Sequence, residues 1–242
     1  MIRRPPRSTL SSSSAASDVY KRQTLIGDTY KIDENKIKKI IPGVDKKIFI
    51  PDSSVEKENI ILSIGRIQKQ KGQIQTLEFL NNFKKIEKDF KCYFIGGPSG
   101  KNGNEYLNEL KQSVEEFNLN THVEFLDNLP QTEIIDLFKK AKLLIHTSQF
   151  ETFGLVAIEA NAMGVPVLTT NNGSLMEIIE NNKNGYLSES LLDGNVNNFV
   201  NNLFNDNAKY EEISSSCIEK SKKYDWAKTT NELESLYKQL VG

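Results

Sequence analysis

Short runs rich in β-branched and aromatic residues alternate with amphipathic or apolar segments of helical length from Lys36 onward. This alternation is typical of repeated βα units around a parallel sheet. The predicted strands cover residues 59–65, 91–97, 123–127, 143–148, 165–170 and 185–189. The predicted helices cover residues 73–87, 104–117, 132–140, 154–163 and 175–180. The pattern therefore predicts an α/β fold with a doubly wound, Rossmann-like parallel sheet.

Two flanking segments complete this prediction. Residues 36–51, "KIKKIIPGVDKKIFIP", are expected to form a strand followed by a turn that leads into the domain. Residues from about Asn195 to Leu240 are expected to form a C-terminal tail that is helical throughout.

The first 23 residues, "MIRRPPRSTLSSSSAASDVYKRQ", differ in composition from the rest. They contain four of the five arginines in the chain. They lack the apolar segment of a secretory signal, although a basic, serine-rich start is also typical of a transit peptide. The string closely resembles a translated sequencing adapter, so we treat residues 1–23 as a non-native or disordered leader.

Composition excludes several classes of function. The net charge of −1 argues against a nucleic-acid-binding arm and against an anionic membrane surface. No apolar run is long enough to span a membrane. Cys92 and Cys217 lie far apart and match no metal-binding spacing, so we expect reduced thiols in a cytoplasmic protein.

Unusual residues follow the predicted strands one loop after another, as expected where parallel strands present a ligand site at their carboxyl ends. In "GRIQKQKG", Gly65 allows a close backbone approach, and Arg66 and Lys71 bring two cations to this edge. A guanidinium binds phosphate oxygens in pairs. A solvated surface arginine explains the same motif equally well. In "NNGSLME", Gly173 is expected in a turn before a short helix, as an N–H donor or as a plain loop.

The segment "ETFGLVAIEANAMG" holds a carboxylate in an unfavourable place. A helix is expected from Gly154, and its first N–H groups would form an anion site at the edge of the sheet. Glu159 lies more than one turn inside this helix, so capping does not explain it. A bound hydroxyl or a cation would compensate for its burial; the alternative is that one stripe of the helix reaches solvent.

Other catalytic classes find little support. The loop "GGPSGKNGN" lacks the spacing of a phosphate-binding P-loop, and no G-x-G-x-x-G follows the first strand, so it is expected to be a connecting loop. Glu151 and Glu159 are spaced for two ends of an extended ligand rather than for one hydrolysed bond. His146 is expected to be a packed or hydrogen-bonded core residue, and no cluster has metal-ligand spacing.

These motifs together resemble the donor-binding half of a GT-B glycosyltransferase of the retaining class called family 4. The resemblance spans about residues 36–240, and its signature is a Glu-x7-Glu pair with an intervening F-G-L. The motifs that carry it are "IPGVDKKIF", "SIGRIQKQKG", "FIGG", "VEFLDNL", "ETFGLVAIEANAMGVPV", "NNGSLMEII" and "NGYL".

The resemblance implies roles for these residues. Glu159 would hold the ribose hydroxyls of a nucleotide-diphosphate sugar, and Glu151 would bind hydroxyls of the donor sugar. Arg66 and Lys71 would clamp the diphosphate and stabilise its charge as the sugar leaves. The base would lie near residues 126–129. Backbone contacts to sugar or phosphate would come from Phe153, Gly154 and Leu155. Neither a metal nor another cofactor is expected.

The resemblance also implies an organisation. Residues 24–45 would be the remnant of an N-terminal acceptor domain and its linker, and residues 46–242 the nucleotide-sugar-binding domain. The intact enzyme would be a hexosyltransferase of bacterial glycan, polysaccharide or glycolipid synthesis, acting on an acceptor glycan or lipid-linked sugar, with peripheral membrane contact through the missing domain. The chain alone is expected to be inactive. Thr152 replaces a glycine of the usual motif, which requires that its backbone is not left-handed.

Two other functions remain open from sequence. One is a GT-B nucleotide-sugar epimerase, for which no additional acid–base set is visible. The other is a module that binds nucleotide sugars without turnover.

Overall fold

The computed structural model describes residues 29–33, 36–38, 40–171 and 173–241, so the leader of residues 1–23 lies outside the described residues. Six strands form one parallel sheet in the order β3-β2-β1-β4-β5-β6. The strands are β1 Glu58–Ile64, β2 Lys91–Ile95, β3 Val123–Leu126, β4 Ala141–His146, β5 Val167–Thr170 and β6 Gly185–Ser188. The predicted doubly wound α/β sheet is confirmed.

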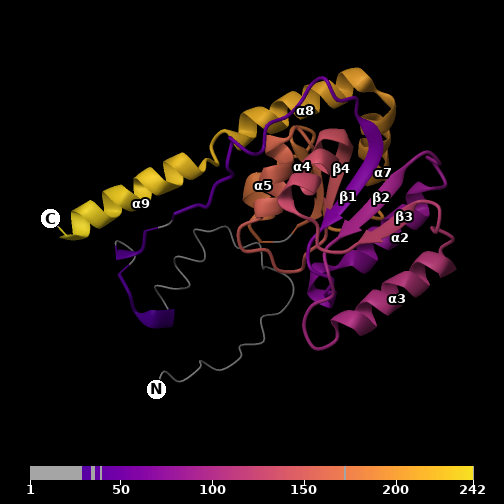
Figure 1. Cartoon of the computed structure of the whole chain (residues 1–242), viewed down its shortest axis with the longest axis horizontal. Helices are drawn as coiled ribbons and strands as arrows, with labels where there is room; N and C mark the ends of the chain where they lie inside the picture. The colour runs from indigo at the N-terminus through magenta and orange to yellow at the C-terminus, as the bar shows by residue number, and fades with distance from the viewer. Residues whose placement is uncertain (1–28, 34–35, 39, 172, 242) are drawn as a thin grey trace.

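Helices connect the strands (Figure 1). They are α2 Gln73–Phe83, α3 Gly103–Glu116, α4 Gln131–Lys140, α5 Leu155–Ala162, α6 Leu175–Ile178, α7 Gly194–Asn205, α8 Asn207–Ser221 and α9 Trp226–Val241, with a 3-10 turn, η2, at Lys69–Lys71. Each of the five predicted crossover helices is present. Helix α2 ends before its predicted end at Glu87, because residues 84–86 form turns instead.

Side chains alternate between the two faces of the sheet, as the period of a strand requires. In β1, Ile61 packs with α2, α3 and α7 on one face, while Ile60 and Leu62 pack with α4, α5 and α6 on the other. Strand β4 is buried at every position, which is typical of a central parallel strand covered on both faces. Figure 1 shows α3 and α5 on opposite sides of the strands.

The strand predicted within residues 36–51 is wrong. Among its described residues, only Val44 makes a bridge, to Asp225. The segment lies away from the edges of the sheet, beside α8 and the start of α9 (Figure 1), where the Thr229 hydroxyl donates to the Ile41 carbonyl at 2.7 Å. Of its β-branched residues, Val44 is buried, whereas Ile41, Ile48 and Ile50 are exposed.

The helical tail is correct in type but is not continuous. Asp206 has an extended backbone between α7 and α8, and its carboxylate accepts from the Lys209 amide as an N-cap. A second break at residues 222–225 separates α8 from α9. Short polar side chains that bond the backbone favour such helix starts over helix interiors.

Candidate functional site

The loops that follow β1, β4 and β5 are joined by backbone hydrogen bonds at the carboxyl edge of the sheet. The Gln149 amide donates to the Gln70 carbonyl at 2.8 Å, and the Ser174 amide donates to the Glu151 carbonyl at 3.3 Å. The strand order reverses between β1 and β4, where doubly wound sheets commonly bind ligands. These loops therefore gather where the sequence predicted a site.

Glu151 accepts several hydrogen bonds at this edge. Its Oε1 accepts from the amides of Thr152 at 3.1 Å and Gly154 at 3.2 Å. Its Oε2 accepts from Lys71 Nζ at 3.2 Å and lies 2.9 Å from His146 Nε2. Burial alone would raise the pKa of Glu151, but the hydrogen bonds and charges of His146 and Lys71 outweigh it. The pKa of Glu151 therefore lies well below its ordinary value, and the group is a carboxylate.

His146 is the partner whose role the sequence did not indicate. The predicted hydrogen-bonded core histidine is confirmed, since the ring lies at the end of β4 with only 6% of its side chain exposed. Its partner is the Glu151 carboxylate. Because a carboxylate only accepts, Nε2 must carry the proton. The signal in the sequence was the position of His146 near the end of the strand predicted at residues 143–148, five residues before Glu151.

The two cations of the first loop differ in their surroundings. Lys71 is mostly buried, and its stem passes over Gly65, where an added Cβ would lie 4.0 Å from Lys71 Cδ. The Arg66 side chain is exposed, and its guanidinium makes no hydrogen bond or ion pair with any residue that the structure describes. The Arg66 backbone is nevertheless fixed, because Gln73 Nε2 donates to its carbonyl at 2.9 Å. Arg66 can thus turn toward an anion without breaking an ion pair.

Glu159 lies in the second turn of α5 and is half-buried between buried neighbours. No described residue forms a hydrogen bond or ion pair with its carboxylate. Burial raises the pKa of Glu159 to about 7. Among the described residues, the Glu159 carboxylate is therefore uncompensated, and the ligand expected to compensate it stays a prediction.

The start of α5 lies one residue after its predicted position at Gly154, and the Gly154 amide donates to Glu151 Oε1. Gly154 is the N-cap with φ 67, and the helix begins at Leu155. Phe153 and Leu155 are both exposed. The described non-glycine residues with a left-handed backbone are Lys31, Asn118 and Asn182. Thr152 is not one of them, so its replacement of a glycine causes no backbone strain.

Position 173 requires a glycine because of its backbone conformation and the close approach of the Glu151 backbone. Its φ is 56, and a Cβ would lie 2.4 Å from the Glu151 carbonyl oxygen. We expect Gly173→Ala to lower the free energy of unfolding by about 1–3 kcal/mol, through left-handed strain and displacement of the Glu151 backbone. Urea denaturation measures this change. Gly194→Ala is the matched control, because a Cβ there meets nothing within 4 Å; equal losses in both variants would contradict the prediction.

The loops after β2 and β3 form a second contact at this edge. The Gly97 amide donates to Asn128 Oδ1 at 3.1 Å. A Cβ at Gly96 would lie 2.4 Å from the Gly65 carbonyl oxygen, so the loops after β1 and β2 are also in close contact. The loop at residues 96–104 was predicted to be a connecting loop, and its role toward Asn128 was missed.

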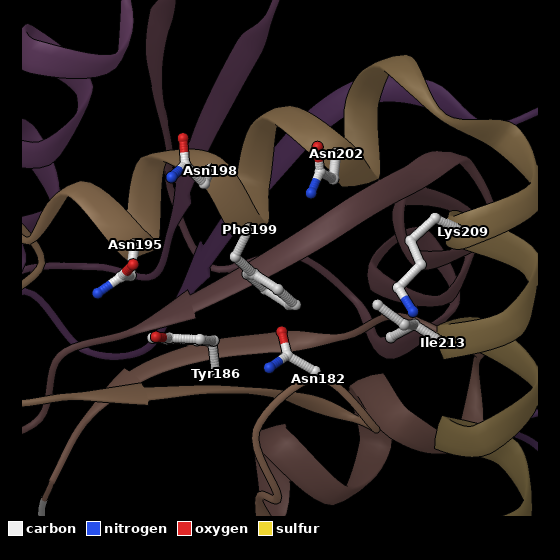
Figure 2. Close-up of a pocket in the computed structure, with 8 residues that line it drawn as sticks. All are labelled: Asn182, Tyr186, Asn195, Asn198, Phe199, Asn202, Lys209 and Ile213. Carbon is white, nitrogen blue, oxygen red and sulfur yellow. The ribbon is translucent and has the colours of Figure 1, made fainter.

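A separate hollow of about 200 Å³ lies beside β6, between α7 and α8 (Figure 2). Its lining consists of Asn182, Tyr186, Asn195, Asn198, Phe199, Asn202, Lys209 and Ile213. The ring centroids of Tyr186 and Phe199 lie 5.2 Å apart. None of the residues predicted to carry chemistry lies in this hollow.

The described residues hold neither a metal-binding cluster nor a membrane-spanning helix. Among them, no group of three or more His, Cys, Asp or Glu side chains has a metal-binding arrangement. No described helix combines the length and apolar character needed to cross a membrane. Cys92 and Cys217 are both buried and free, and burial raises the pKa of each thiol.

Known structures share this fold. The Anabaena protein HepE, solved in complex with UDP, superimposes with a TM-score of 0.78 at 23% identity, covering 90% of this chain and 61% of that one. The C-terminal domain of the Francisella tularensis glycosyl transferase group 1 family protein LpcC superimposes with a TM-score of 0.66 at 26% identity, covering 76% of this chain and 99% of that domain.

Sequence relatives are also glycosyltransferases by name. The D-inositol 3-phosphate glycosyltransferase of Corynebacterium glutamicum is 25% identical over 228 residues, which cover 88% of this chain and 54% of that protein. The enzyme of the same name from Corynebacterium urealyticum is 27% identical over 229 residues, covering 89% and 54%. The chain thus spans about half the length of these relatives. The family model "Glycosyl transferases group 1" matches residues 45–224, and the chain therefore belongs to the group 1 glycosyl transferases.

Proposed function

We propose that this chain is the donor-binding domain of a retaining, GT-B, family 4 glycosyltransferase, and that it binds a nucleotide-diphosphate sugar. The intact enzyme would transfer the sugar, a hexose, to an acceptor glycan or lipid-linked sugar. Two features support this proposal: the family to which the chain belongs and the UDP held by a structural neighbour of the same fold.

The observation that carries the proposal is the state of Glu159. An ionised carboxylate in a half-buried position without a partner lowers stability, because burial penalises its charge. Such a group gains most from a ligand that brings hydroxyl donors. The vicinal hydroxyls of a ribose are donors of this kind, so Glu159 is proposed to bind the ribose of the nucleotide.

The neighbouring residues suit the other parts of the donor. Arg66 and Lys71 are proposed to bind the diphosphate and to stabilise its charge as the sugar leaves. Glu151 is proposed to bind hydroxyls of the sugar. Gly65 and Gly173 would allow close backbone approach at two loops. Backbone groups of Phe153 and Leu155 at the start of α5 would contact sugar or phosphate. Gly154, predicted in the same role, has its amide on Glu151 Oε1 and would form the turn that places these groups.

The base is proposed to lie near residues 126–129, where Asn128 already bonds the Gly97 amide. The acceptor is proposed to bind a part of the intact enzyme outside this chain, which spans about half the length of its relatives. Neither a metal nor another cofactor is needed in this scheme, because the two cations and the helix N-terminus supply the charge that opposes the diphosphate.

Calorimetric titration of the full chain with UDP, GDP and ADP tests the proposal. We expect one nucleotide to bind more tightly than the others and thereby to identify the base. The corresponding nucleoside monophosphate should bind more weakly, since it lacks the second phosphate. Absence of binding of all three nucleotides to a folded sample would refute the proposed donor site.

A further inference from the structure

We propose that His146 positions Glu151, and that Lys71 exchanges one partner for another when a diphosphate binds. In the ligand-free domain Lys71 is held by Glu151. The diphosphate takes the Lys71 ammonium, and His146 keeps the Glu151 carboxylate in place. This inference rests on the proposed function and extends it to a residue and a step that it does not include.

The geometry of the Glu151 carboxylate motivates the exchange. A carboxylate offers about four lone-pair positions. At least four donors already point at Glu151, including two backbone amides at Oε1 and two side chains at Oε2. A sugar hydroxyl that donates to Glu151 therefore competes with one of these four. The two amides belong to the loop that starts α5, and replacing them would require that loop to move.

The two side-chain partners differ in freedom. His146 is 6% exposed at the end of a strand that is buried at every position, so its ring has little room to move. Lys71 ends a 3-10 turn, and its side chain is 23% exposed on a flexible stem. The Thr147 hydroxyl lies within hydrogen-bond distance of the Lys71 carbonyl at 3.1 Å and of the Gly72 carbonyl at 2.9 Å, so the Lys71 backbone is fixed while its ammonium can move. Lys71 is therefore the partner that leaves.

The charges favour the same order of events. A diphosphate carries more negative charge than one carboxylate and attracts an ammonium more strongly. Arg66 precedes Lys71 on the same loop and has no competing partner among the described residues. The diphosphate can therefore bind Arg66 without breaking an existing ion pair. It then binds the Lys71 ammonium, which leaves the Glu151 carboxylate. The hydrogen bond from His146 Nε2 then keeps the charged Glu151 compensated.

Histidine NMR can test both parts, because the chain has only two histidines. His122 is a built-in control, with Nε2 bonded to the Lys88 carbonyl and Nδ1 to the Thr121 hydroxyl, away from this edge. In ¹⁵N-histidine-labelled full-length chain, we expect the proton of His146 on Nε2. Saturating inorganic pyrophosphate should shift the His146 Nε2 resonance and leave His122 unchanged. In Lys71→Met, the ligand-free His146 resonance should already be displaced from its wild-type position.

Substitution of His146 tests the positioning role. In His146→Leu, the Glu151 carboxylate loses one donor and depends more on Lys71 for compensation of its charge, so Lys71 should be released less readily. We expect pyrophosphate affinity, measured by calorimetry, to fall about tenfold. His146→Gln retains an N–H donor and should recover most of the loss. A purely structural role would instead lower the melting temperature of both variants and leave pyrophosphate affinity alike in the two.

The outcomes separate the two proposals. A His146 Nε2 without a proton would overturn the positioning role, whatever the ligand does. A His146 resonance that stays fixed while pyrophosphate binds with measurable heat would overturn the exchange and leave the donor site intact. If neither pyrophosphate nor any of the three nucleoside diphosphates binds, the proposed function fails and the exchange with it.

Discussion

Replacing Glu159 with glutamine is expected to stabilise the ligand-free domain and to weaken its binding of nucleotides. The two effects have one cause, which is that Glu159 is half-buried and its carboxylate bonds no residue that the structure describes. Burial raises the pKa of Glu159 from 4.5 to about 7. Because the folded state holds its proton more tightly than the unfolded chain, stability falls as pH rises between these values. Above pH 7 this penalty is on the order of 3 kcal/mol.

Urea denaturation of both proteins at pH 5 and pH 8 measures this dependence. Glu159→Gln should show its larger gain at pH 8, where the wild-type carboxylate is charged. At pH 5 the wild-type group is mostly protonated, and the two proteins should differ little. A gain that is equal at both pH values would contradict an electrostatic origin.

Nucleotide affinity should change in the opposite direction. Two ribose hydroxyls that donate to a carboxylate form charge-assisted hydrogen bonds, each worth about 1.5–3 kcal/mol. Their weakening by a neutral amide is expected to reduce affinity by about tenfold or more. Calorimetry with the nucleotide that binds best, and with its 2′-deoxy form, measures the effect. If Glu159→Gln weakens the ribose and deoxyribose forms equally, Glu159 does not bind that hydroxyl.

The fold could be predicted because its determinants are local in sequence. The central residues of β1 and β4 are apolar and buried, as is typical of parallel strands covered on both faces, and the intervening helices have their own patterns. The strand predicted within residues 36–51 is wrong because its formation depends on contacts that are not local in sequence. Its β-branched residues resemble a strand, but a strand needs a partner, and the neighbours of this segment are α8 and α9. The strand propensity of a segment does not show which element it will pack against.

The site could be predicted only in part. Arg66, Lys71, Glu151 and Glu159 were indicated by residue type and by their place after or near strand ends. The bond between His146 and Glu151 could not be predicted, because it depends on how the loop after β4 turns back over the strand. The pairing of Lys71 with Glu151 joins residues 80 positions apart for the same reason. Such contacts are set by loop geometry and not by spacing.

Arg66→Ala is expected to weaken the binding of nucleoside diphosphates far more than the binding of nucleosides. The Arg66 guanidinium is exposed, bonds no described side chain, and follows the strand end at which Lys71 also lies. Its removal deletes charge-assisted bonds to phosphate worth about 1.5–3 kcal/mol, which corresponds to a loss of roughly tenfold to a hundredfold. A nucleoside lacks phosphate and should bind both proteins alike. Titration calorimetry with the selected diphosphate and its nucleoside measures the difference.

Two further variants separate the geometry of Arg66 from its charge. Arg66→Lys keeps the charge but loses the planar fork, so it should recover part of the affinity and not all of it. Lys69→Ala removes another cation of the same loop, one that pairs with Glu109 at 3.0 Å on α3. Lys69 is exposed and already forms an ion pair with Glu109. Salt screens exposed charges at a distance, so Lys69→Ala should change diphosphate affinity by no more than about twofold. Equal losses in Arg66→Ala and Lys69→Ala would mean that the loop attracts anions by its net charge, and that Arg66 makes no specific bond to the diphosphate.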